Sequence, residues 1–206
     1  MGSDGVTHGF VLRRGNYTTV DFPGAASTEV LGINDRGELV GDYSSSSIVP
    51  CCAAGTHGFI RGRGHYTTID YPGAIFTYAN GINSRGEIVG AYSDGTPHGF
   101  YLNRGNYVSI DHPGASFTNA LGISPRGDIV GRYVDTTGRH GYLLSRGTFS
   151  TIDVPGATLT GATAISLEGD IVGRYSSAGV FHGFVLSRSE SHGDEDRKDG
   201  DRNGPQ

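Results

Sequence analysis

The chain of 206 residues carries a net charge of −5, with 35 glycines, 8 prolines, 2 cysteines and no tryptophan. This mildly acidic charge lacks the basic surface of a nucleic-acid binder, so we expect no nucleic-acid partner. No apolar run approaches the length of a membrane span, and the start at Met1–Asp4 is not a basic-then-apolar signal segment. Valine, isoleucine, threonine, tyrosine and phenylalanine fill most apolar positions, which is typical of β-sheet proteins.

Three short sequence motifs, called phrases below, recur along the chain. The phrase H-G-(F/Y) begins at His8, His57, His98, His140 and His182, D-x-P-G-A begins at Asp21, Asp70, Asp111 and Asp153, and (G/A)-I-(N/S)-x-x-G-(D/E)-(I/L)-V-G-x-Y begins at Gly32, Gly81, Gly122 and Ala164. A nearly fixed period indicates an array of small units that share one core, because no unit can bury its apolar face alone. We therefore expect a single repeat domain over residues 1–188.

The unit over residues 77–113 shows how each repeat is expected to fold. Its pattern predicts strands over residues 78–83, 87–93, 98–102 and 107–111. Tight turns separate the first strand from the second and the third from the fourth, and Gly86 is expected to supply a positive φ in the first of them. Pro113 follows the fourth strand, and proline cannot continue a hydrogen-bonded ladder.

Four short antiparallel strands in a unit of about 42 residues are typical of a β-propeller blade. The sequence therefore predicts an all-β fold, a small β-propeller with four blades. The strand that carries Ala79 and Gly81 is expected to be innermost, because blades converge at the axis and leave little room there. The strand that ends before Pro113 is expected to be outermost, since a sheet edge tolerates proline.

The number of expected strands does not fit a whole number of blades. The third strand of the unit occurs five times, whereas each other strand occurs four times. A closed four-bladed ring would complete its last blade, residues 162–186, with the N-terminal strand at 17–21. One strand, at 10–12 or at 184–186, would then be spare. A five-bladed ring and a propeller that exchanges strands between copies are the alternatives, and a spare strand would allow a homo-oligomer through strand pairing.

Two segments stand apart from the repeats. Cys51 and Cys52 are adjacent in the longest loop, either as plain loop thiols or as a vicinal disulfide. Residues 189–206 hold six acidic and three basic side chains, which predicts a disordered acidic tail. Within it, residues 199–204 match the first half of a calcium loop, but no later ligands follow.

The three phrases together resemble the bacterial extracellular repeat family called HAF repeats. That family has H-A-F near the start of its unit and (A/G)-I-N-x-x-G-x-V-V-G-x-S later, and the resemblance covers residues 6–186. Here glycine replaces the alanine after histidine, and the tryptophan of the family motif is absent. The resemblance implies a propeller-like fold and an extracellular or cell-surface location. It implies no activity and no catalytic residues.

The repeated histidines and aspartates are expected to be structural. Candidates for this role are His57, His98, His140, His182, Asp21, Asp70, Asp111 and Asp153. Metal binding and acid–base chemistry are the alternatives. However, a residue that occurs once in every unit serves to build the unit, because a catalytic site breaks the symmetry of a repeat array. We therefore expect these pairs to fix strand register, with no metal site and no cofactor.

The recurring tyrosines are expected to be core residues. These are Tyr43, Tyr92, Tyr133 and Tyr175. Each ring would lie between blades, with its hydroxyl group bound to a polar partner. The alternative is a sugar-stacking platform on every blade, which would make the protein a multivalent lectin.

Positions that differ between repeats are the candidates for a unique ligand site. On the expected inner strands these are Glu29, Tyr78 and Asn119, followed by Leu31, Asn80, Leu121 and Thr163, and before the recurring tyrosine they are Asp42, Ala91, Arg132 and Arg174. Two arginines beside an aspartate suit an anionic or polyol ligand. We therefore assign ligand binding to Glu29, Tyr78, Asn119, Asp42, Arg132 and Arg174.

These observations favour a non-catalytic extracellular module that binds a glycan, another surface polymer or a small polar ligand. A structural protein whose copies are joined by a spare strand is the second hypothesis. An enzyme that uses an axial pocket is the third, because the sequence has no G-x-S-x-G, H-E-x-x-H or P-loop motif.

Overall fold

A computed structural model describes residues 6–45 and 55–187, which form seventeen β-strands and no helix. The first hairpin comprises β1 (Gly9–Arg13) and β2 (Asn16–Val20). The first sheet comprises β3 (Ser27–Ile33), β4 (Leu39–Ser44), β5 (Thr56–Gly62) and β6 (His65–Ile69). The second sheet comprises β7 (Phe76–Ile82), β8 (Ile88–Ser93), β9 (Pro97–Asn103) and β10 (Asn106–Ile110).

The C-terminal half continues the same pattern. The third sheet comprises β11 (Phe117–Ile123), β12 (Ile129–Val134), β13 (Arg139–Ser145) and β14 (Thr148–Ile152). The last sheet comprises β15 (Leu159–Ile165), β16 (Ile171–Ser177) and β17 (Val180–Leu186). Sequence neighbours within each sheet pair antiparallel, and one parallel pair, Arg139 with Leu159, links the third sheet to the last. The all-β prediction and the order of strands in the unit are confirmed.

An Arg-Gly pair forms the turn in the first hairpin and the turn between the third and fourth strands of the three four-stranded sheets. In the second sheet, Arg104 and Gly105 have φ of 49° and 83°. Positive φ at both central residues is the type I′ geometry that matches the twist of a two-residue hairpin. The turn before β8 also follows the sequence, because Gly86 has a φ of 81° as expected.

The strand with small residues lies on the inside of the fold, as predicted. The strands β3, β7, β11 and β15 follow one another in contact, while β6, β10 and β14 lie at the opposite edges of their sheets. Gly81 shows why this strand needs small residues, since a Cβ there would lie 3.0 Å from the carbonyl oxygen of Leu121 in the next sheet. Each of these four inner strands also carries a register shift, just before the glycine in β3, β7 and β11 and just before Ala164 in β15.

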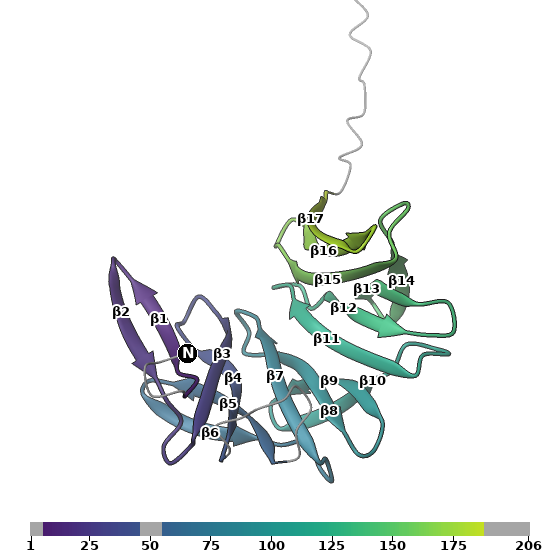
Figure 1. Cartoon of the computed structure of the whole chain (residues 1–206). Helices are drawn as coiled ribbons and strands as arrows, with labels where there is room; N and C mark the ends of the chain where they lie inside the picture. The colour runs from purple at the N-terminus through teal and green to yellow at the C-terminus, as the bar shows by residue number, and fades with distance from the viewer. Residues whose placement is uncertain (1–5, 46–54, 188–206) are drawn as a thin grey trace, which may run out of the picture.

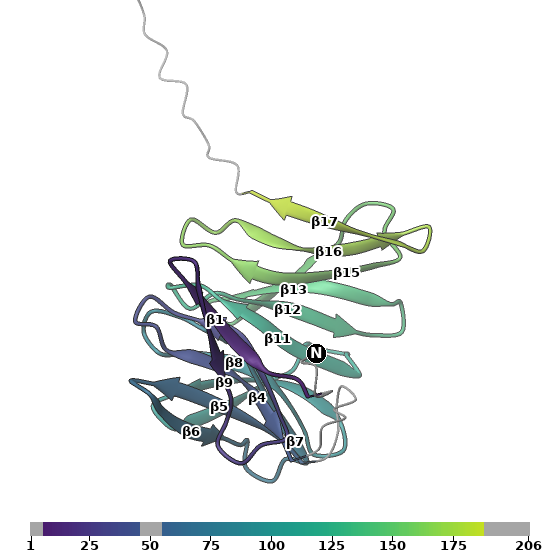
Figure 2. The ribbon, with the colours of Figure 1, turned by 60° about the vertical axis from the view of Figure 1, so that its left-hand side comes forward.

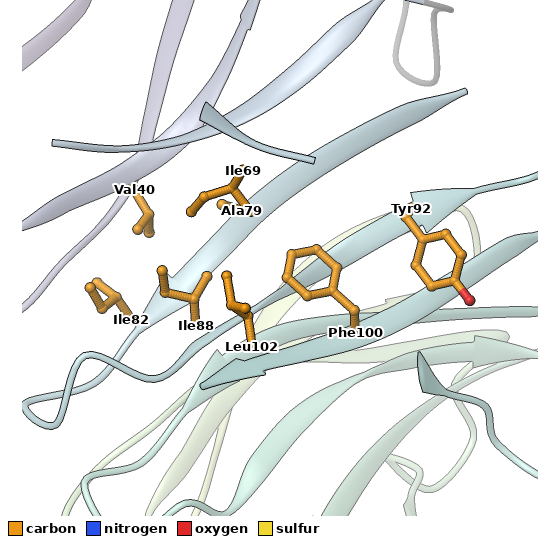
Figure 3. Close-up of a cluster of buried hydrophobic side chains, with 8 residues drawn as sticks. All are labelled: Val40, Ile69, Ala79, Ile82, Ile88, Tyr92, Phe100 and Leu102. Atoms are coloured by element: carbon orange, nitrogen blue, oxygen red, sulfur yellow. The ribbon is translucent and has the colours of Figure 1, made fainter. Parts of the chain in front are cut away.

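The hydrophobic core is divided between consecutive sheets. Figure 3 shows one cluster, in which Val40 and Ile69 of the first sheet meet side chains of the second. Those side chains are Ala79, Ile82, Ile88, Tyr92, Phe100 and Leu102. Two further clusters repeat this arrangement between the second and third sheets and between the third and last. Burying one such phenylalanine contributes about 2–3 kcal/mol, so each sheet depends on its neighbours for stability.

The expected closure into a four-bladed ring is not what the structure contains. The strand β2 pairs with β1, and within residues 6–45 and 55–187 no pairing joins β2 to β17. Figure 1 shows an open arc with the first hairpin and the last sheet at opposite ends, and Figure 2 shows β17 at the outer edge of the last sheet. The reason is local, because a tight turn joins β1 to β2, whereas pairing with β17 closes a very long loop.

Some sequence predictions lie outside the described residues. These are the state of Cys51 and Cys52, the acidic tail over residues 189–206 and its half calcium motif. Within the part of the chain that the structure describes, there is no helix long and apolar enough to cross a membrane.

Candidate ligand groove on the inner strands

The residues that vary between repeats form one cross-strand pair in each sheet. Because the first and second strands are antiparallel, the pairs are Glu29 with Asp42, Tyr78 with Ala91, Asn119 with Arg132 and Gly161 with Arg174. The sequence presents these positions as two separate sets, and the structure joins them. The pair is acidic in the first sheet, uncharged in the second and basic in the third and last, so charge changes along the inside of the arc.

A groove of about 640 Å³ gathers four of the six predicted ligand residues, Tyr78, Asn119, Arg132 and Arg174. The rest of its lining comprises Phe76, Asn80, Ala91, Pro97, Phe117, Leu121, Val134 and Arg139. The groove therefore lies along the inner strands of the second and third sheets, β7 and β11, and the last sheet adds Arg174 of β16. Its volume is in the range of pockets that hold small organic ligands.

Two amides form the polar centre of this groove. Asn80 Nδ2 donates to Asn119 Oδ1 at 2.8 Å and to the carbonyl oxygen of Ala120 at 2.8 Å. These bonds cross from the second sheet to the third and fix the orientation of the Asn119 amide. Fixed amide groups beside aromatic rings are a common way to position a polar ligand.

Three arginines give the groove its positive charge. The guanidinium carbon of Arg132 lies 5.6 Å from the centre of the Phe117 ring, and that of Arg174 lies 5.4 Å from the centre of the Phe181 ring. Arg139 is exposed at the start of β13. A planar guanidinium presents several donors in a fixed geometry, which suits carboxylates, sulfates and neighbouring sugar hydroxyls.

The two acidic candidates do not lie with the arginines. Glu29 and Asp42 face each other in the first sheet, outside the groove, so the expected arrangement of two arginines beside an aspartate is wrong. Asp42 is only 3% exposed, whereas Glu29 is exposed. Burial, together with the negative charge of Glu29, raises the pKa of Asp42 to about 7. The residues fall in different sheets because their shared repeat position says nothing about distance along the arc.

The repeated histidines and aspartates pair as their spacing suggests. The closest Nδ1–carboxylate distances are 2.9 Å for His8–Asp21, 3.0 Å for His57–Asp70, 2.6 Å for His98–Asp111 and 2.9 Å for His140–Asp153. Each pair joins the start of a third strand to the residue after the fourth. His182 stacks on Tyr175 instead, and no D-x-P-G-A phrase follows it. No group of three or more metal-ligating side chains occurs within the described ranges.

The recurring tyrosines are covered on both faces in the three complete sheets. Tyr92 stacks on Tyr71 with ring centres 3.5 Å apart and on His98 at 5.0 Å, and its hydroxyl group binds Ser109 at 3.0 Å. Tyr43 and Tyr133 are sandwiched in the same way, by Phe22 and His57 and by His112 and His140. The prediction of core tyrosines with bound hydroxyl groups is therefore confirmed for these three, and their faces are not open to sugars.

A second, larger cavity of about 870 Å³ lies between the second and third sheets. Its lining includes the turn residues Arg85, Arg126 and Arg146, which recur in the repeats. An equivalent cavity of about 500 Å³ lies between the first hairpin and the first sheet and includes Arg13 and Arg36. Because this cavity is repeated, it is a feature of the unit, whereas the arginine groove occurs where the repeats differ.

No family model matches the chain, and no curated protein sequence matches it. Similarity is found among solved structures. TolB from Acinetobacter baumannii matches with a TM-score of 0.60 and 14% identity, over 84% of this chain and 43% of that chain. A mutant of AofleA from Arthrobotrys oligospora, with three arginines replaced by alanine, matches with a TM-score of 0.47 and 15% identity, over 83% of this chain and 58% of that chain. This chain spans less than half of the TolB chain, and the similarity shows that its fold is that of a β-propeller protein.

Proposed function

We propose that this chain is a non-catalytic module that binds a glycan in the groove on its inner strands, with a preference for acidic sugars. The observation that carries the proposal is the combination of Arg132, Arg139 and Arg174 with the bound amides of Asn80 and Asn119 in one groove. Guanidinium groups bind carboxylate or sulfate substituents, and amides bind hydroxyl groups. The aromatic residues of the lining add apolar surface for sugar rings.

The chemistry of the groove supports binding over catalysis. Its lining residues include no carboxylate, imidazole, thiol or serine hydroxyl. Glycoside hydrolysis uses a pair of carboxylic acids on either side of the bond, and the acidic pair of this chain lies elsewhere, at Glu29 and Asp42. An enzyme that uses this groove is therefore the weaker hypothesis.

The groove also favours one ligand site in each chain. The tyrosines that would form a platform on every sheet are stacked between other rings in the three complete sheets. Several sites would then come from several copies, and avidity would depend on assembly. The resemblance to HAF repeats supports an extracellular or cell-surface setting, where such polymers occur.

Calorimetric titration with an oligouronate and with a neutral oligosaccharide of the same length tests this proposal. We expect the oligouronate to bind more tightly, and Arg132→Ala to weaken its binding by about tenfold or more, which corresponds to about 1.4 kcal/mol. Arg126→Ala, an exposed arginine outside the groove, is the matched control and should bind like the wild type. No binding of either sugar, or equal loss in both variants, would contradict the proposal.

A further inference from the structure

The two ends of the arc expose side chains that the other sheets bury. On the second strand, Val40, Val89 and Val130 are fully buried, whereas the equivalent Val172 of the last sheet is 40% exposed. On the first strand, Ile82 is 7% exposed, whereas the equivalent Ile33 of the first sheet is 58% exposed. Both ends therefore expose an apolar face whose equivalents in the other sheets are buried against a neighbouring sheet.

The contacts between sheets show what covers these positions elsewhere. The second strand of each sheet packs on the first strand of the next, as β4 does on β7, β8 on β11 and β12 on β15. Among the strands that the structure describes, β16 is the one second strand with no following sheet, and β3 is the one first strand with no second strand before it. The two exposed faces are thus the two halves of one interface that already occurs three times in the chain.

Charge at the two ends agrees with this pairing. At the interface between the third and last sheets, the side chain of Arg132 lies over Gly161, where a Cβ would be 3.8 Å from Arg132 Cβ. Arg174 is the residue of β16 equivalent to Arg132, and Glu29 is the residue of β3 equivalent to Gly161. The same packing would therefore place Arg174 beside Glu29, and both side chains are exposed in the single chain.

We propose that the last sheet of one copy packs against β3 of a second copy, with Arg174 facing Glu29 and Val172 covering Ile33. The occupant is a second copy because Figure 1 places the two faces at opposite ends of an open arc. The three internal interfaces hold the inner strands close together at Gly32, Gly81 and Gly122, which resists further bending of the arc. This inference does not depend on the proposed glycan binding.

In the assembly, β17 of one copy and β1 of the second copy are equivalent strands that compete for pairing with the same strand, β2 of the second copy. Within residues 6–45 and 55–187, the last sheet has three strands, β15, β16 and β17, and β2 of the second copy would be its fourth. However, β1 of the second copy already pairs with β2. Gly9 lies opposite Val20 there, in the same register as Gly58 opposite Ile69, so β1 takes the place of a third strand. We therefore expect β17 of one copy to replace β1 of the other. Phe10 and Leu12 on β1 are 60% and 52% exposed, whereas the equivalent Phe100 and Leu102 on β9 are 0% and 9% exposed, so β1 buries less apolar surface than a third strand between two sheets.

Sedimentation velocity without ligand, over a wide range of protein concentrations, tests this assembly. We expect concentration-dependent dimers or larger species for the wild type. Each single variant, Glu29→Arg and Arg174→Glu, should weaken assembly by about tenfold or more because like charges then meet. An equimolar mixture of the two variants should restore it, because each contact again joins an arginine to a glutamate.

Two further variants separate loss of assembly from loss of folding. Val172→Asp should abolish assembly and keep the melting temperature of the monomer, because Val172 is already exposed there. Val108→Asp is the matched control, since Val108 is 56% exposed on β10, away from both ends, and it should assemble like the wild type. Deletion of residues 1–14 removes the competing strand β1 and should strengthen assembly.

Several outcomes would overturn the proposal. A wild-type chain that stays monomeric at every concentration, also without residues 1–14, would exclude it. The double variant Glu29→Arg/Arg174→Glu could recover the contact between positions 29 and 174 as a monomer, while the mixture of single variants stays unassembled. That result would show that a single chain closes on itself. Equal loss in Val172→Asp and Val108→Asp would place the contact elsewhere.

Discussion

The second sheet and the last sheet carry nearly the same phrases and bury them differently. Phe100 is fully buried and Val89 with it, whereas the equivalent Phe184 is half-buried and Val172 is 40% exposed. The second sheet lies between two neighbours, and the last sheet has one. The comparison shows that burial in this fold is a property of the stack of sheets, as in other repeat proteins, and that the end units are incomplete without a neighbour.

The largest expected difference between middle and end concerns the aromatic residue after His-Gly. Phe100→Ala should lower the free energy of unfolding by about 3–5 kcal/mol, because it leaves a cavity between two sheets. Phe10→Ala changes the equivalent residue, which is 60% exposed, and should cost less than about 1 kcal/mol. Denaturant unfolding measures both. Equal losses would show that the first hairpin is packed like the complete sheets.

Asp42, the buried acidic residue of the first sheet, should make the free energy of unfolding depend on pH. The pKa of Asp42 is raised to about 7 in the folded chain, so the folded state keeps a proton that the unfolded chain loses near pH 4. The free energy of unfolding therefore falls as pH rises between about pH 4 and pH 7 and is level above that window. Asp42→Asn should remove this dependence and be more stable at pH 8 by on the order of 2 kcal/mol.

Thermal unfolding at a series of pH values measures this effect. Asp35→Asn, at an exposed turn position of the same sheet, is the matched control and should keep the wild-type pH dependence. An Asp42→Asn variant whose advantage is the same at pH 4 and pH 8 would contradict the assignment of the ionised carboxylate as the cause.

The glycine after each histidine gives a smaller and more local comparison. A Cβ at Gly99 would lie 3.1 Å from the carbonyl oxygen of Ile110 and 3.3 Å from the amide nitrogen of Ala120, so Gly99→Ala should destabilise the chain by about 1–3 kcal/mol. A Cβ at Gly183 would have its nearest neighbour at 3.8 Å, and Gly183→Ala should be nearly neutral. Chemical denaturation of the two variants side by side checks this, and similar costs would mean that another strand covers β17.

The smallest expected effect concerns the histidine–aspartate pairs. His98 binds Asp111 at 2.6 Å in the second sheet, but Asp111 is half-exposed, so this pair should contribute only about 0.5–1 kcal/mol. A double-mutant cycle with His98→Ala and Asp111→Ala measures that coupling. His182→Ala, without such an aspartate in its repeat, should change the free energy of unfolding by less. A large coupling energy would point to a role beyond strand register.

The sequence predicted those parts of the fold that depend on local chemistry. The positive φ of Gly86, the turn at Arg104 and Gly105 and the inner position of the strand with Ala79 and Gly81 all follow from residue type and spacing. Closure did not follow, because it depends on a competition between β1 and β17 for β2. The two strands share the same phrase, and only the short Arg14–Gly15 turn, which keeps β1 beside β2, distinguishes them.

The candidate site was predicted in part for a similar reason. Variation between repeats pointed to Tyr78, Asn119, Arg132 and Arg174, and the groove contains all four. Phe76 and Phe117 were missed, although the first position of the inner strand also varies between repeats, and this signal would have found them. The separation of Asp42 from the arginines depends on which sheets are neighbours, which the repeat positions do not encode.

Hydrogen exchange of β17 tests the central claim, that the end sheets are incomplete in one copy and are completed by another. At low protein concentration, we expect the amides of β17 to exchange much faster than those of β9, the equivalent strand of the second sheet. As concentration rises, protection should appear in β17 and remain unchanged in β9. Protection of β17 equal to that of β9 at the lowest concentration would contradict the open arc, and fast exchange of β17 at every concentration would contradict its completion by a second copy.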